Sequence, residues 1–353
     1  MINYNRTVTC GLMAAALAMP SLASAYGWDT CGGNTVRWKS NPTFRASDIS
    51  FPSGSQSRAT LQSMVNEINR TNGFNLNVGF GTDTGNSSSF NGVNEIGFVS
   101  DLPSDVLGNA RTKRNLFCYS SNSARIQEAD IRFNSNISWT NSAFTGANFG
   151  SPFSLALVAL HEFGHGLGLN HYNNTPATMN AFYPNGGSLG RNTVGLHGDD
   201  TAGLRWLYGG GSGGNDLFAT KFKNAGATME RNLIRTTGGS ITTSLNKGTS
   251  YQIDYSLQNK GSNRNNNVIT RLYASTNAFI STSDYYLGQI SWSMPAGSHV
   301  ESNVTVNIPN SIPSGQYYIG YVVDSNRQVS ESNESNNQTY LSVAGTGDRY
   351  TIN

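Results

Sequence analysis

Residues 161–171 read HEFGHGLGLNH and fit the pattern H-E-x-x-H-x-x-G-x-x-H at all five fixed positions. His161 and His165 are four residues apart, so on a helix both side chains stand on one face and can bind one zinc ion. Gly168 can adopt the positive φ that ends a helix, which would bring His171 back as a third ligand. Three protein ligands leave one position on the zinc open, as catalytic rather than structural zinc sites do.

Glu162, next to the first histidine, indicates the reaction. A zinc ion would lower the pKa of its bound water and polarise a carbonyl, and Glu162 would take the proton of that water as general base and pass it to the leaving amine. The pattern therefore predicts an endopeptidase with one catalytic zinc and with proteins or peptides as substrates. The alternative is a buried helix without metal, but only five histidines occur in the chain and three of them fall in this run.

Length and charge limit the possible domain organisation and the possible classes of partner. A chain of 353 residues exceeds the size of a usual single core, so two domains are expected. Lys and Arg total 23 against 21 Asp and Glu, and basic runs are missing from the sequence. Nucleic-acid binding depends on neutralising many phosphates, so we do not expect nucleic acid as a partner.

The first 25 residues are organised as a secretory signal peptide. Arg6 precedes an apolar stretch at residues 10–19, and Ala23-Ser24-Ala25 forms an A-x-A cleavage site. The apolar stretch is shorter than the roughly 20 residues that span a bilayer, and no later segment reaches that length. We therefore expect a secreted, extracellular protein without a transmembrane segment, whose mature chain begins at Tyr26.

Two cysteines, Cys31 and Cys118, remain after removal of the signal peptide. An even pair in an oxidising compartment predicts a disulfide. One alternative stays open, in which Cys31 acts as a thiolate that blocks the zinc ion.

A glycine-rich linker at residues 209–215 divides the rest of the chain. Residues 26–208 mix helical and strand patterns, which indicates an α+β domain with a mixed sheet. The predicted helices cover residues 61–68 and 154–167, and the predicted strands cover residues 76–80, 95–99 and 129–133. Residues 216–345 alternate short β-rich runs with turn residues, which is typical of an all-β antiparallel sandwich, and residues 346–353 are expected to form a tail. Because a glycine-rich linker carries few contacts, we expect the two domains to be separable.

Met179 follows the third histidine within a segment that resembles the methionine turn of the metzincins. With this turn, residues 35–208 resemble the catalytic domain of the matrixin branch, and residues 196–209 resemble its C-terminal helix. The resemblance implies that Met179 packs beneath the histidines and that residues 129–134 form the edge strand on which substrate lies. Tyr183 is a candidate for the wall of the specificity pocket, although an unrelated buried or surface tyrosine is an equal alternative.

The sequence departs from the matrixin pattern in several places. No histidine precedes His161, so the second, structural zinc of the animal enzymes is not expected. The Pro-x-Tyr wall of the family is replaced by Ala181-Phe182-Tyr183, and the Pro-Arg-Cys-Gly latency segment is missing from the sequence. Substrate preference is therefore not carried over from the family.

The C-terminal region resembles the bacterial adhesion-related CARDB modules in residues 315–318, 322–324 and 331–337. The resemblance implies an immunoglobulin-like sandwich that binds a surface or matrix ligand. Calcium is a further candidate cofactor, but the acidic, Asn-rich residues 331–337 fit a solvated turn better than an oxygen-ligand loop. A different class of function is an adhesin whose zinc domain is catalytically silent, and the retention of Glu162 favours the enzyme.

Overall fold

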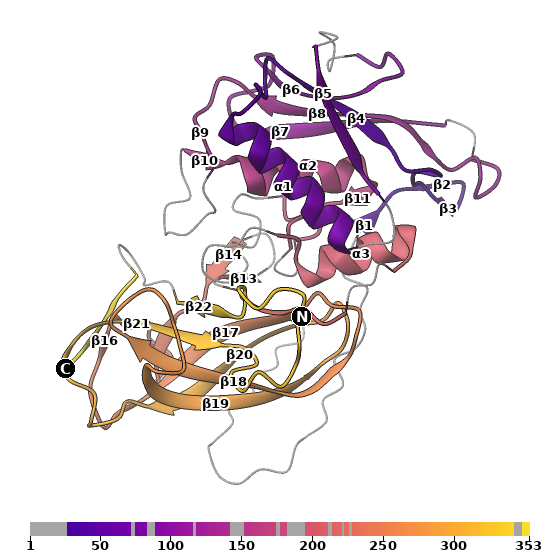
Figure 1. Ribbon diagram of the computed structural model, residues 1–353. Helices are drawn as coiled ribbons and strands as arrows, with labels where there is room; N and C mark the ends of the chain where they lie inside the picture. The colour runs from indigo at the N-terminus through magenta and orange to yellow at the C-terminus, as the bar shows by residue number, and fades with distance from the viewer. Residues whose placement is uncertain are drawn as a thin grey trace.

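The computed structural model describes residues 27–71, 75–82, 89–115, 118–141, 152–173, 177–181, 195–210, 214–220, 222–225, 228–341 and 348–353. The predicted signal peptide, residues 211–213 of the predicted linker and Tyr183 lie outside these residues. Figure 1 shows a sheet with helices, formed by the N-terminal part, next to a sandwich formed by the C-terminal part. In the described part of the chain, no helix has both the length and the apolar character needed to cross a membrane.

A five-stranded sheet in the order β5-β4-β6-β8-β7 organises the N-terminal part. Its strands are β4 (Thr43–Ser47), β5 (Asn77–Gly81), β6 (Asn94–Val99), β7 (Gly108–Arg114) and β8 (Ile126–Asn134). The pairs are parallel except that β7 runs antiparallel to β8. Two helices pack together beside this sheet, α1 (Gln56–Thr71) and α2 (Leu155–Gly166), while α3 (Gly198–Tyr208) follows at the end (Figure 1).

The apolar core of this part forms between the helices and the sheet. Leu61, Val65 and Ile68 recur on one face of α1, as their spacing predicts, and all three are buried. Phe163 of α2 packs edge-on against Phe44 of β4 with ring centroids 6.0 Å apart. The core therefore fixes α2, which carries the candidate ligands, against the sheet.

The resemblance implies an edge position for strand β8, and the structure corrects this point. It lies between β6 and β7, and both of its faces are buried. Its polar face is covered by neighbouring loops: the backbone N–H of Asn91 donates to Glu128 at 2.6 Å, and the Asn134 amide donates to the carbonyl of Pro103 at 2.9 Å. The edge strand on this side of the sheet is therefore β7, and β5 is the edge strand on the other side.

Short pairs complete the N-terminal part. They are β1 (Gly27–Trp28) with β11 (Leu169–Asn170), β2 (Thr30–Cys31) with β3 (Asn34–Thr35), and β9 (Trp139–Thr140) with β10 (Phe153–Ser154). A disulfide joins Cys31 to Cys118, which confirms the predicted bridge. Because the bridge occupies the Cys31 sulfur, it leaves no thiolate there to block a metal ion.

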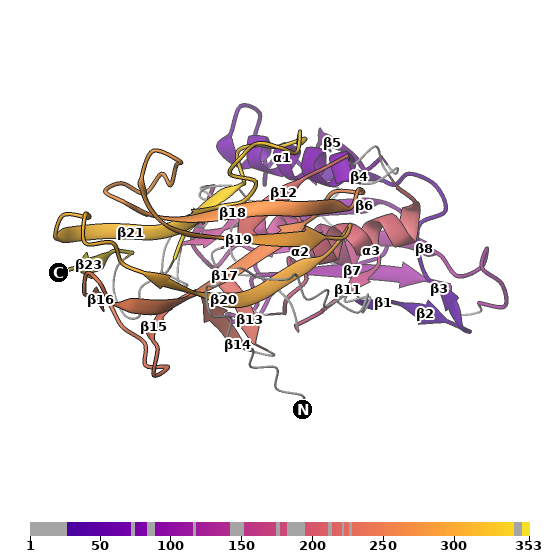
Figure 2. The ribbon, with the colours of Figure 1, turned by 90° about the horizontal axis from the view of Figure 1, so that it is seen from below.

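Two sheets face each other in the C-terminal part. The first contains β12 (Leu217–Thr220), β15 (Ile234–Thr236), β17 (Ser250–Asn259) and β20 (His299–Asn307). The second contains β16 (Ser244–Leu245), β18 (Asn265–Ser275), β19 (Tyr285–Met294), β21 (Gly315–Val322), β22 (Gln338–Tyr340) and β23 (Tyr350–Ile352). A separate hairpin pairs β13 (Phe222–Ala225) with β14 (Thr228–Arg231). Figure 2, seen from below, shows β18 and β21 on one side of the sandwich and β15, β17 and β20 on the other.

The last residues belong to the sandwich and not to a tail. Strand β23 pairs with β16 and β21, and its alternating residues Tyr350 and Ile352 are fully buried in the core of the sandwich. The division of the chain at residues 209–215 stays a prediction, although Gly214 already accepts a backbone hydrogen bond from Ser262 at 2.9 Å.

Candidate metal centre

Helix α2 places two histidines one turn apart in a buried environment. Its N-cap is Ser154, whose hydroxyl accepts from the backbone N–H of Leu157 and so satisfies one of the free donors of the first turn. After the helix Gly168 has φ +99°, and a Cβ at this position would lie 3.1 Å from the carbonyl oxygen of Val36. The predicted glycine turn is therefore present, and the chain returns through β11 to His171.

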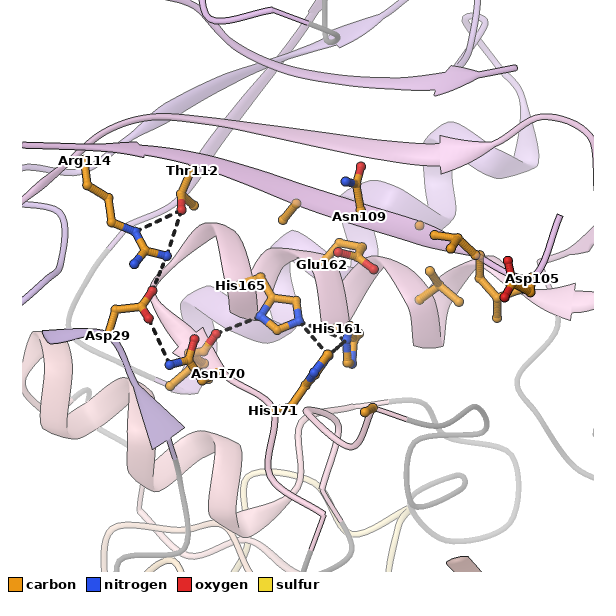
Figure 3. A pocket seen from close by; sticks show the side chains of 17 residues that line it. Asp29, Asp105, Asn109, Thr112, Arg114, His161, Glu162, His165, Asn170 and His171 are labelled. Carbon is orange, nitrogen blue, oxygen red and sulfur yellow. Dashed lines mark hydrogen bonds and ion pairs between the residues drawn. The ribbon is translucent and has the colours of Figure 1, made fainter. Parts of the chain in front are cut away.

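The three histidines meet at one point (Figure 3). The Nε2 atom of His161 lies 3.1 Å from that of His165 and 3.1 Å from that of His171, and the last two are 3.0 Å apart. A tetrahedral zinc ion with bonds of about 2.0–2.1 Å would separate its nitrogen ligands by roughly 3.3 Å. The three nitrogens thus fit three corners of a zinc coordination shell, as the sequence predicts.

Backbone carbonyls fix the tautomer of two of these rings. The Nδ1 atoms of His161 and His165 lie 2.8 Å from the carbonyl oxygens of Thr178 and Leu169. Because a carbonyl can only accept, each Nδ1 must carry the proton, which leaves the lone pair of Nε2 directed at the common point.

Burial also keeps the rings neutral. Burial, and to a lesser extent the neighbouring His165, lowers the pKa of His161 to about 3. Burial lowers the pKa of His165 to about 4 against the opposing effect of its hydrogen bond to Leu169, and burial lowers the pKa of His171 as well. Neutral imidazoles are the form that binds metal ions.

Met179 lies beneath the histidines, where its turn is held by α3. A Cβ on Gly164 of α2 would lie only 2.2 Å from the Met179 sulfur, so the turn packs directly on the ligand helix. The Asp200 carboxylate accepts from the backbone N–H groups of Thr178 and Met179 at 2.7 and 3.0 Å. Sequence reasoning missed the role of Asp200, which only the fold brings to the turn.

Glu162 faces the same cleft from α2, and its carboxyl group is buried. Burial raises the pKa of this carboxyl to about 8, while a hydrogen bond from the backbone N–H of Ala110 in β7 acts in the opposite direction. The bond holds Glu162 against the edge strand, in the cleft that the three histidines also line.

Strand β7 forms one wall of the cleft. Gly108, Asn109, Ala110 and Thr112 line it together with the three histidines and Glu162 (Figure 3). Within the described residues, β7 pairs with no strand other than β8, so its outer edge remains open beside the histidines. The cleft also contains charged groups at both ends, with Asp105 at one end and an Arg114–Asp29 ion pair at the other.

The acidic, Asn-rich loop at residues 331–337 is not a simple solvated turn. Glu331 accepts from the backbone N–H of Leu217 and from the amide of Asn337, and buried Asn336 donates to Asp216 at 2.8 Å. These polar groups are therefore used to attach the loop to β12 and the segment before it.

Comparison with known families agrees with this arrangement. The matrixin family model matches residues 70–209, and the CARDB family model matches residues 233–340. The predicted order of a matrixin catalytic domain followed by a CARDB sandwich is thus confirmed.

Curated relatives match part of the chain. Human matrix metalloproteinase-27 is 41% identical over 81 residues, which cover 23% of this chain and 14% of that protein. Rabbit (Oryctolagus cuniculus) macrophage metalloelastase is 41% identical over 81 residues, covering 23% and 15%. The hatching enzyme of Paracentrotus lividus is 31% identical over 160 residues, covering 44% and 21%. The chain therefore spans between 14% and 21% of the length of these relatives.

Among solved structures, the chain is similar to the crystal structure of a CARDB domain from Pyrococcus furiosus in complex with di-metal ions. The two are 14% identical, and the match covers 40% of this chain and 94% of that one with a TM-score of 0.26.

Proposed function

We propose that this chain is a secreted zinc-dependent endopeptidase, in which His161, His165 and His171 hold one zinc ion and Glu162 is the general base. The observation that carries the proposal is the convergence of three neutral imidazole Nε2 atoms, 3.0–3.1 Å apart, in a cleft that also contains Glu162. The matrixin match over residues 70–209 supports the class of enzyme.

A zinc ion at this point would supply Lewis acidity, lowering the pKa of a water molecule in the open position and polarising the scissile carbonyl. Glu162 accepts the proton of the attacking water as its oxygen bonds to the carbonyl carbon. It then delivers that proton to the amine nitrogen as the C–N bond breaks. The bond from Ala110 N–H keeps the carboxyl group in position for both transfers.

The open edge of β7 supports an extended peptide as substrate. The N–H of Ala110 points towards Glu162 and so away from β8. The N–H groups of consecutive residues in a strand point in alternate directions, so residues two apart point the same way. Gly108 and Thr112 therefore present their N–H groups to the cleft too. An extended substrate would pair with this edge as an added strand, which places a peptide bond across the histidines.

The Cys31–Cys118 disulfide supports secretion, since structural disulfides persist in oxidising compartments. Protein substrates in the surroundings of the cell follow from this location. The CARDB sandwich is compatible with a role in binding a surface or matrix ligand.

Replacement of the base tests the proposal. We expect the purified chain to hold one zinc ion, and we expect Glu162→Gln to keep that ion while turnover of a peptide falls by about 10²–10⁴-fold, because only proton transfer is removed. Metal analysis and peptide hydrolysis measure the two effects on the same sample.

Glu334→Gln, which removes an exposed carboxylate from the sandwich, is the matched control and should hydrolyse peptide at the normal rate. Zinc binding without hydrolysis in the unmodified chain would instead support the adhesin with a silent zinc domain. Near-normal hydrolysis by Glu162→Gln would show that another group is the base.

A further inference from the structure

The N-terminal end of α3 is capped by a side chain from the other domain. Gln258 of β17 is fully buried, and its Oε1 accepts from the backbone N–H of Gly198 at 2.8 Å. Its Nε2 donates to Nδ1 of His197 at 2.9 Å. The first N–H groups of a helix have no partner within the helix and are normally satisfied by a nearby residue. Here a residue 60 positions along the chain satisfies one of them.

The backbone of α3 lies directly against the sandwich at this point. A Cβ on Gly198 would lie 3.3 Å from the carbonyl oxygens of Asn259 and Ser298. Gly297 has φ +67°, and a Cβ there would lie 2.7 Å from the Cβ of Ala202. Larger side chains at either glycine would separate α3 from β17, so close packing and the Gln258 cap depend on each other.

Charged groups enclose the contact on both sides. Lys260, which is 2% exposed, donates to Glu67 of α1 at 2.8 Å. Arg70 of α1 pairs with Asp216 at 2.8 Å. Arg205 of α3 donates to the carbonyl of Gly261 at 2.9 Å. Lys260 and Asp216 are buried, so breaking their pairs with Glu67 and Arg70 would leave a buried charge uncompensated.

Hydrogen bonds of Asp200 and Thr178 connect the capped turn of α3 to His161. Asp200, in the first turn of α3, accepts from His197 N–H at 3.0 Å and from the N–H groups of Thr178 and Met179. The carbonyl of Thr178 accepts from Nδ1 of His161. Each of these contacts is a hydrogen bond between buried groups. Movement of the α3 terminus would therefore change the hydrogen bond that orients the His161 ring.

We propose that Gln258 is a positioning residue, through which the sandwich holds the α3 terminus, the Met179 turn and His161 in the geometry of the metal centre. The expected effect on zinc affinity rests on the proposed function, whereas the expected effect on the order of the Met179 turn does not. The sandwich is accordingly part of the support of the metal centre.

Gln258→Met tests this inference because it keeps the length of the side chain and removes its hydrogen bonds. We expect zinc affinity to fall about tenfold, at the low end of the effect of losing a partner of a metal ligand. We also expect amide hydrogen exchange in residues 177–181 to speed up about tenfold. Gln252→Ala, on the same strand but with no hydrogen bond to α3 in the structure, is the control and should change neither quantity.

Unchanged exchange in residues 177–181 and unchanged zinc affinity in folded Gln258→Met would overturn the proposal. If that variant does not fold, native-state hydrogen exchange of the unmodified chain decides. The backbone amides of Gly198, Thr178 and Met179 should exchange through one opening reaction with the same denaturant dependence. Separate opening reactions for these amides would overturn the proposal. If the unmodified chain binds zinc but cleaves no peptide, the proposed peptidase function fails while both readouts still test Gln258.

Discussion

Gly164 leaves room for the Met179 sulfur in the middle of the ligand helix. We expect Gly164→Ala to destabilise the fold by about 1–3 kcal/mol, because the added methyl group would overlap the sulfur at 2.2 Å and force the turn away. Zinc affinity should fall with it. Urea unfolding and zinc competition with a chelator measure the two effects.

Gly166→Ala on the same helix is the matched control. A Cβ at this position would meet its nearest neighbour, Ile131, at 3.6 Å, which is an ordinary contact. Equal losses for the two variants would mean that helix flexibility, and not the Met179 contact, determines the effect.

The sequence predicts the histidines at the residue scale because their spacing is local. His161 and His165 follow from helix periodicity, and Gly168 predicts the turn to His171. Asp200 and the N–H of Ala110 could not be predicted in the same way. They reach the metal centre only through the packing of α3 and β7, and hydrophobic patterns do not encode these contacts.

At the scale of elements, β7 is a strand that the sequence pattern did not predict. Its residues GNARTKR show no apolar alternation, since an edge strand beside a cleft has little apolar surface to bury. Strand β8 shows alternation through Ala129, Ile131 and Phe133, but loops bury its polar face too. Patterning therefore identified the strand correctly, whereas the family resemblance placed it wrongly at the edge of the sheet.

The edge position of β7 gives a prediction about substrate binding. Thr112→Pro removes an N–H that points to the cleft and leaves the bonds to β8 intact, so we expect kcat/KM for an extended peptide to fall about 2–12-fold, the value of one hydrogen bond. Thr112→Val keeps this N–H and should retain activity.

Both variants lose the Thr112 hydroxyl that accepts from Arg114, so their difference isolates the backbone group. Steady-state hydrolysis of a long and a short peptide measures the difference in kcat/KM between the two variants. Identical kinetics for the Pro and Val variants would exclude pairing of substrate with β7 at this position.

At the scale of the whole molecule, the linker predicted two separable domains. The structure shows partly buried polar contacts between the two parts, such as Lys260 with Glu67 and Arg70 with Asp216, partners separated by 193 and 146 residues. A sequence read in order gives no sign of such pairs. The order of the domains could be predicted from composition, but the contact between them could not.

This contact makes stability depend on pH. Burial alone would raise the pKa of Glu67, but the charges of Lys260 and Arg70 outweigh burial and lower it to about 2 from 4.5. A lowered carboxyl pKa contributes stability that is complete above pH 4.5 and is lost as the pH falls towards 2. The shift corresponds to about 3 kcal/mol.

We therefore expect Glu67→Gln to destabilise the chain by about 3 kcal/mol at pH 7 and by much less near pH 2.5. Urea unfolding at several pH values measures the difference, with exposed Glu334→Gln as control. A deficit that is the same at both pH values would show that Glu67 is not ionised in the folded chain.

Product analysis tests whether this cleft hydrolyses peptides in a zinc-dependent reaction. The chain is incubated with a mixed peptide library, with and without a zinc chelator, beside Glu162→Gln, and the products are identified by mass spectrometry. We expect new peptide termini from the zinc-loaded chain, few or none with the chelator or the variant, and recovery when zinc is restored. An intact library with the zinc-loaded chain would show that this cleft is not a peptidase site, and equal cleavage by Glu162→Gln would show that Glu162 is not the base.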